Sequence, residues 1–91
     1  MAYAAIRIKA ADFEGWKRNF EGMTEVRRAN GSHGGMVFRN PTDSEEFILL
    51  VDWENLETGR RLVQSPEVQE KMRAVGVSLY QPYVASDTFD A

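Results

Sequence analysis

The sequence lacks cysteine altogether and holds one histidine and three prolines in 91 residues. The missing cysteines exclude disulfides, thiolate zinc sites, iron–sulfur clusters and a cysteine nucleophile. The single histidine, His33, excludes a histidine-rich metal site within one chain. No apolar run is long enough to span a membrane, and residues 1–9 do not have the pattern of a signal peptide. We therefore expect a cytoplasmic protein that needs no cofactor and no metal and has no membrane partner.

The net charge is also small, at −3, but it is unevenly distributed. Residues 1–40 hold seven basic and four acidic side chains, whereas residues 41–91 hold four basic and ten acidic ones. A weakly acidic chain lacks the net basic face that nucleic-acid binding needs, so no nucleic-acid partner is expected. The adjacent pairs Arg27-Arg28 and Arg60-Arg61 are interpreted as solvated charges on helices.

The residues that are present are typical of a globular chain. Hydrophobic residues make up 43% of the sequence, and ten residues are aromatic. The length predicts one domain over residues 1–91, because two separate cores of this size would each be too small to be stable. Residues from about 86 onward form a polar tail.

The first half of the sequence predicts a strand and then a helix. Apolar and polar side chains alternate over residues 1–9, which is typical of a strand. Asp12 can cap a helix that extends to about Ala29, with a break near Gly22 and a stop at Asn30-Gly31. The apolar stripe of this helix consists of Phe13, Trp16, Phe20 and Met23.

A hairpin follows in the sequence. Residues 32–35 are interpreted as a loop, residues 36–39 as a second strand and residues 40–44 as a turn. Residues 45–53 form the strongest predicted strand, and its apolar run indicates that both of its faces are covered. Phe47, Leu49, Val51 and Trp53 share one face, whereas Ile48 and Leu50 share the other.

The last part of the chain predicts a helix in two pieces and a final strand. Asn55 caps the first piece, and Ser65-Pro66-Glu67 starts the second, which ends at Gly76. Residues 77–84 form the last strand, in which Gln81-Pro82 favours an edge position because proline cannot donate to a ladder.

The resulting order is β-α-β-β-α-β, which is the order of the ferredoxin-like α+β fold. The helices would cover one face of a four-stranded antiparallel sheet. The other face would expose Ile48 and Leu50, and burying them requires a partner surface. We expect a homodimer that joins through its sheet faces.

Several short motifs resemble those of the antibiotic biosynthesis monooxygenase family, within the dimeric α+β barrel superfamily. The resemblance spans roughly residues 3–84. The matching residues are Trp16-Lys17 with Phe20, His33-Gly34-Gly35 before Val37-Phe38-Arg39-Asn40, Asp43, Val51-Asp52-Trp53, Leu56-Glu57, Ser65-Pro66-Glu67, Met72 and Ala74-Val75-Gly76-Val77.

The resemblance implies a dimeric barrel, but the chemistry of such barrels varies. Haem-degrading members use an asparagine on the first strand and a histidine on the helix before the last strand, and this sequence has neither. The cofactor-free oxygenases need only an apolar cavity, a Trp or Tyr, and polar groups that stabilise a substrate anion. The resemblance therefore favours a monooxygenase-like enzyme for a small aromatic or polyketide-like molecule. The alternatives are a non-catalytic ligand-binding or accessory dimer and a fully packed structural module.

The candidate catalytic residues are His33 and Arg39. An imidazole in a glycine-flanked loop can act as a base or hold an anion, although a surface histidine without a role is an alternative. An arginine at the end of the second strand, on the face opposite Phe38, can bind a carboxylate or phenolate; an ion pair with Asp52 or Glu46 is the alternative.

The candidate substrate-binding residues are large and apolar or aromatic, and they would surround a cavity between sheet and helices. Core or interface packing is the alternative role for each of them. This set consists of Trp16, Phe20, Met36, Phe38, Trp53 and Tyr80.

Overall fold

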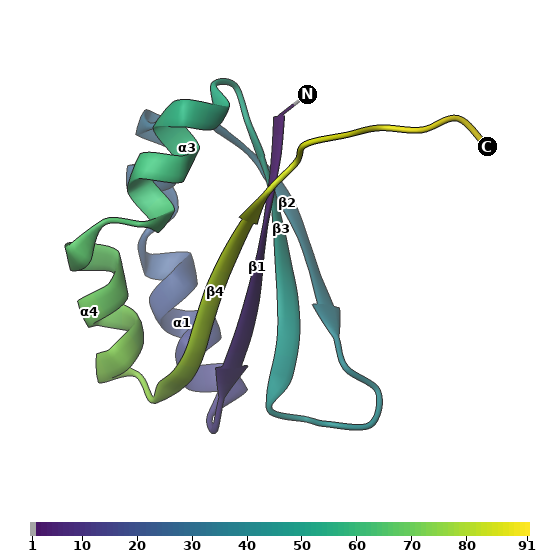
Figure 1. Ribbon diagram of the computed structural model, residues 1–91. Helices are drawn as coiled ribbons and strands as arrows, with labels where there is room; N and C mark the ends of the chain where they lie inside the picture. The colour runs from purple at the N-terminus through teal and green to yellow at the C-terminus, as the bar shows by residue number, and fades with distance from the viewer. Residues whose placement is uncertain (1) are drawn as a thin grey trace.

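The computed structural model describes residues 2–91 as one sheet with helices against it. Figure 1 shows the path of the chain through these elements. Residues 85–91 have no regular structure and extend away from the body of the molecule. In chain order the elements are β1 (Ala2–Ala10), α1 (Phe13–Gly22), α2 (Thr24–Ala29), β2 (Ser32–Arg39), β3 (Glu46–Trp53), α3 (Leu56–Val63), α4 (Pro66–Ala74) and β4 (Val77–Val84).

The helices α1, α3 and α4 begin directly after the predicted N-cap residues. The Asp12 carboxylate accepts a hydrogen bond from the Gly15 amide at 3.0 Å. The Asn55 side chain accepts from two amides at the start of α3, and the Ser65 hydroxyl accepts from the Val68 amide. Each cap satisfies amides that have no partner within the helix, which fixes where the helix begins.

The predicted interruption of the first helix is also confirmed. Helix α1 ends at Gly22 and α2 begins at Thr24, so the chain changes direction at Met23. Gly31 and Gly76 follow the ends of α2 and α4 with φ values of 90° and 83°. Only glycine adopts such angles without strain, which explains why these helices end there.

The sheet is antiparallel, with strand order β2-β3-β1-β4. Together with the helices it forms the predicted ferredoxin-like α+β fold. Strand β4 lies at an edge, as Gln81-Pro82 indicated. The first strand was expected from residue 1, which lies outside the described residues.

The start of β2 differs from the prediction. Residues 32–35 belong to the strand and not to a loop, with a shift in register between Ser32 and Gly35. Gly34 has a φ of 101°, and a Cβ at Gly35 would overlap the Leu50 carbonyl. The two glycines therefore allow an irregular strand to form where a loop was expected.

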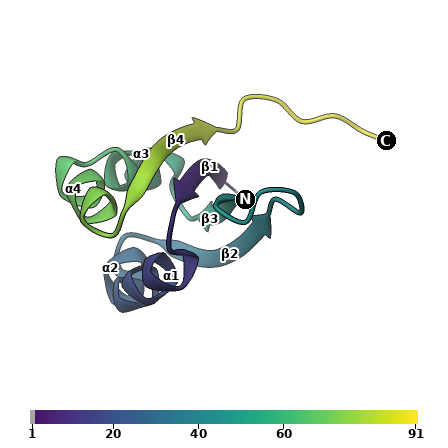
Figure 2. The same cartoon turned by 90° about the horizontal axis from the view of Figure 1, so that it is seen from below.

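All four helices cover one face of the sheet (Figures 1 and 2). Their apolar side chains enclose a core that includes the predicted inward face of β3, from Phe47 to Trp53. Gly59 of α3 lies so close to the Trp53 ring that a Cβ there would overlap it. No helix among residues 2–91 has the length and hydropathy needed to cross a membrane.

The opposite face of the sheet is open and carries both apolar and charged side chains. Ile48 is 42% exposed, and its cross-strand partner Phe38 is 50% exposed. Met36 pairs with Leu50 next to them. The predicted second face of β3 is therefore the centre of an uncovered apolar surface in the single chain.

Candidate functional site

The space between the sheet and the helices contains a small apolar cavity of about 40 Å³. This volume holds roughly one or two water molecules and is well below the few hundred Å³ of a typical small-molecule site. In this conformation the chain therefore has no room for an aromatic ring at its centre. Predicted site residues that line the cavity are Trp16, Phe20, Trp53 and Tyr80.

Trp16 and Trp53 both line this cavity. Trp16 stacks on Phe20 with 5.0 Å between ring centroids and also contacts Phe47. Both indole rings are almost completely buried, and neither Nε1–H has a hydrogen-bond acceptor. An unpaired buried N–H is costly, and an oxygen atom that reached either donor would remove that cost.

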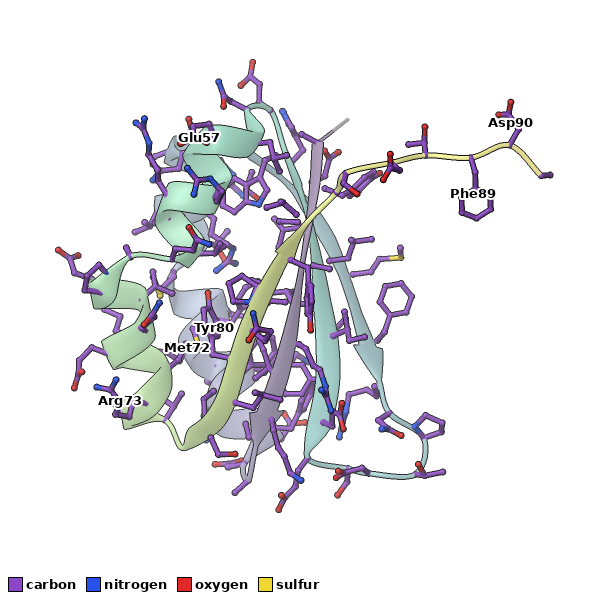
Figure 3. The ribbon with its side chains drawn as sticks, in the orientation of Figure 1. Glu57, Met72, Arg73, Tyr80, Phe89 and Asp90 are labelled. Atoms are coloured by element: carbon purple, nitrogen blue, oxygen red, sulfur yellow. The ribbon has the colours of Figure 1, made fainter. Side chains whose placement is uncertain are left out.

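Tyr80 and Met72 lie in the space between β4 and α4, whereas Arg73 points away from it (Figure 3). The Tyr80 hydroxyl donates a hydrogen bond to the Val63 carbonyl at 2.8 Å. Burial raises the pKa of this phenol, because the charged form would lose its hydration. Tyr80 is therefore a neutral donor that is already engaged by the backbone.

Arg27 is a charged residue at the cavity that the sequence analysis missed. It was interpreted as a solvated charge, but it is half-buried and lines the cavity beside Phe20. Its guanidinium lies 3.5 Å from the centroid of the Phe20 ring. The neighbouring Arg28 does match the prediction, because it is exposed and pairs with Glu25.

Arg27 also borders two further hollows. The first, of about 130 Å³, lies against β2 and β3 and shares Phe20, Leu49 and Val51 with the cavity. The second, of about 400 Å³, is an open recess where α2 meets β2. We call these the edge recess and the basic recess; the basic recess is lined by Thr24, Arg27, Arg28, Ser32, His33 and Gly34.

The structure separates His33 from Arg39. His33 is exposed near the start of β2, whereas Arg39 ends the same strand, six residues or roughly 20 Å away. The Arg39 guanidinium lies 3.7 Å from the centroid of the Phe13 ring and donates to the Ser44 carbonyl. The structure therefore does not bring the two side chains together within one chain, and a catalytic role for either of them stays a prediction.

The ion pair suggested as the alternative role of Arg39 is not found within the described part of the chain. Glu46 pairs with Arg7, at 2.6 Å, and Arg39 has no salt bridge among residues 2–91. This guanidinium instead covers an aromatic ring, which is a common contact for a half-solvated arginine.

The predicted cavity wall is also partly wrong. Phe38 pairs with Ile48 and lies on the open face, away from the cavity. Met36 shares that face but borders the edge recess. Period-2 alternation places Phe38 and Arg39 on opposite faces, so the two could not have lined one cavity.

No other grouping of side chains points to a resident ion. Among residues 2–91, no three His, Asp or Glu side chains lie close enough together to hold a metal. The chemical resources of the site are thus an apolar cavity, two free indole donors and one half-buried guanidinium.

Solved structures with the same fold were found across bacteria. A protein from Bordetella bronchiseptica that bears the antibiotic biosynthesis monooxygenase name is 19% identical, with a TM-score of 0.71 and 97% of each chain covered. One from Deinococcus radiodurans with the same family name is 13% identical, with a TM-score of 0.61 and coverage of 100% of this chain and 96% of that one. These identities show the fold alone.

A third solved structure is described as a dimeric ferredoxin-like protein from an uncultured marine organism. It is 9% identical, with a TM-score of 0.52 and full coverage of both chains. None of the curated proteins matches the sequence. The family model for antibiotic biosynthesis monooxygenases matches residues 1–74. The chain therefore belongs to the antibiotic biosynthesis monooxygenase family.

Proposed function

We propose that this protein is a cofactor-independent monooxygenase-like enzyme acting on a small aromatic or polyketide-like molecule. The observation that carries the proposal is the apolar cavity beside Trp16 and Trp53, whose indole N–H groups have no acceptor. Family membership supports the same chemistry. Two donors in an apolar site favour a guest with oxygen atoms on a ring system, because such a guest satisfies both properties.

The proposed reaction draws its electrons from the substrate. An electron-rich phenol or anthrone loses a proton and passes electrons to O₂. One oxygen atom enters the substrate, so that a ring methylene becomes a carbonyl, and the other leaves as water. The protein's part is to bind the ring, exclude bulk water and stabilise the anion.

The proposal requires the cavity to open, because about 40 Å³ does not admit a ring. Met23 and Met72 line it, and their unbranched side chains can change rotamer at low cost. Opening toward Phe20 would join the cavity to the edge recess, which shares that residue. A substrate would then occupy both spaces.

We also propose that the working unit is a cytoplasmic homodimer joined through the open face of the sheet. Met36, Phe38 and Ile48 expose apolar surface there, and a second copy would bury it. The marine protein named as dimeric supports this assembly. Sedimentation should give twice the mass of one chain, and Ile48→Glu should reduce it to one chain. A single-chain mass for the unmodified protein would contradict the dimer.

The enzymatic proposal is tested by oxygen consumption with a panel of anthrones and quinols. We expect uptake with at least one compound and a large loss of rate in Trp16→Phe, which removes an indole donor while keeping an aromatic ring. His33→Ala, which removes a predicted catalytic side chain, is measured in the same assay. No uptake above background oxidation with any compound would overturn the proposal, and so would uptake whose rate is unchanged in both variants.

A second candidate is a non-catalytic ligand-binding dimer. It is favoured by the small cavity and by the separation of His33 from Arg39, which leaves no assembled acid–base pair. Under this alternative the same compounds would raise the melting temperature without consuming oxygen.

A further inference from the structure

Arg27 is a cation held in place by its own chain. Its Nη1 donates to the Phe20 carbonyl at 2.5 Å, and its Nη2 donates to the Thr24 hydroxyl at 3.1 Å. The guanidinium plane also covers the Phe20 ring. These contacts fix the group at the end of α2 and use two of its five N–H donors, so three remain for another acceptor.

The charge of Arg27 has no carboxylate partner among residues 2–91. In contrast, Arg28 pairs with Glu25, and Arg60 pairs with Glu57. Burial lowers the pKa of Arg27, because the charged form loses hydration without gaining an opposite charge. Guanidinium groups stay charged in proteins, so an anion from outside would be stabilised beside it.

The hollows on either side of Arg27 differ in character. The edge recess is bounded by Phe20, Leu49 and Val51, and its volume of about 130 Å³ is close to the ~150 Å³ that binds benzene in an engineered cavity. The basic recess shares Ser32 with the edge recess and adds Thr24, Arg28 and His33. No carboxylate lines either one.

We propose that Arg27 binds the carboxylate or phenolate of an apolar organic anion whose ring lies in the edge recess. The charged end pairs with the free N–H donors of Arg27 at the basic recess, and the ring contacts Phe20, Leu49 and Val51. As a statement of the substrate class this rests on the proposed function, but the binding itself is independent of catalysis. Arg27 is thus a specificity-determining residue that selects anions over neutral compounds of the same shape.

The site is distinct from the predicted role of Arg39. That guanidinium lies at the far end of β2 over Phe13, and it borders neither the edge recess nor the basic recess. An anion bound in the basic recess would therefore contact Arg27 and not Arg39.

The test uses 4-fluorobenzoate and its neutral analogue 4-fluorobenzyl alcohol, each titrated into the full-length protein and followed by fluorine NMR. The unmodified protein should bind the carboxylate at least about tenfold more tightly than the alcohol. Arg27→Gln should weaken carboxylate binding by about tenfold and leave the alcohol unchanged. Arg61→Gln removes an equal charge from the exposed surface of α3 and should change neither.

Three outcomes would overturn the proposal. They are equal binding of the two probes, carboxylate binding that survives Arg27→Gln, and an equal loss in Arg61→Gln. If Arg27→Gln does not fold, Arg27→Lys replaces it; this variant keeps the charge but loses the planar fork, and it should retain a preference for the carboxylate with weaker binding. The binding titrations do not involve oxygen, so their results hold even if the oxygen-consumption assay is negative.

Discussion

The two faces of β3 carry similar side chains but have different surroundings. Phe47, on the helix-covered face, is 1% exposed, whereas its neighbour Ile48, on the other face, is 42% exposed. Both are large apolar residues near the start of one strand. The helices of the same chain bury the first face, whereas no element among residues 2–91 covers the second.

This difference separates two kinds of apolar surface. The covered face contributes to the stability of each chain by itself, because its burial is complete on folding. The open face contributes only when another surface reaches it, so its contribution should depend on protein concentration.

The largest effect is expected from Trp16→Ala on the covered face. Removing a buried indole leaves a cavity and should lower the free energy of unfolding by about 3–5 kcal/mol. Urea denaturation at two protein concentrations should show the same loss at both. Phe38→Ala on the open face is the comparison. Its loss of unfolding free energy should be smaller than that of Trp16→Ala, and it should be greater at high protein concentration than at low. Equal, concentration-independent losses would remove the distinction between the faces.

Gly59→Ala should have the next largest effect, through the same covered face. The added methyl group overlaps the Trp53 ring, and relieving the overlap should cost about 1–3 kcal/mol. Gly22→Ala is the matched control, because a Cβ there meets no atom within 4 Å. Thermal denaturation measures both variants, and a loss in Gly22→Ala as large as that in Gly59→Ala would contradict the assigned contact.

Tyr80→Phe should have a smaller effect on the covered side. It removes the hydrogen bond to the Val63 carbonyl, which is worth about 1 kcal/mol, while the ring keeps its packing. Tyr83→Phe, on the exposed face of the same strand, should change the free energy of unfolding by less. A loss in Tyr83→Phe that matched the loss in Tyr80→Phe would show that the buried bond is not the cause.

The smallest effect concerns the ion pair beside the open face. The Arg7 guanidinium holds the pKa of the Glu46 carboxyl below its usual value of 4.5. A lowered native pKa stabilises the fold above the unfolded value, and this contribution is lost as pH falls through the native value. Glu46→Gln should therefore flatten the decline in stability below about pH 4.5, as followed by acid titration of the circular dichroism signal. Glu45 has no salt bridge among residues 2–91, so Glu45→Gln should leave that decline unchanged. An equal flattening in Glu45→Gln would show that the Arg7–Glu46 pair is not the cause of the decline.

Local features of the fold were predictable because they depend on neighbouring residues. Asp12, Asn55 and Ser65 cap helices through bonds to amides two or three residues away. The alternation along β3 assigned Phe47 and Ile48 to different faces without any knowledge of the tertiary structure. The order of elements then limited the topology to the ferredoxin-like arrangement.

The candidate site was less predictable because it depends on how elements pack. The burial of Arg27 follows from the break between α1 and α2, which lets the short helix lie against β2. Its neighbour Arg28 has the same local sequence context and remains exposed. A helix of six residues has too little periodicity to distinguish them. The cavity volume could not be predicted from the sequence either, because it depends on the positions of many side chains together.

The edges of the sheet constrain how copies of this chain can associate. Exposed strand edges are sites of open-ended aggregation, because each added strand offers a new edge. Pro82 removes an N–H donor from β4, and the register shift near Gly35 distorts the start of β2. Each edge therefore has an interruption that an incoming strand would have to accommodate. Such edges disfavour fibre growth. Self-association is then favoured through contact between sheet faces, which is complete once two copies have joined.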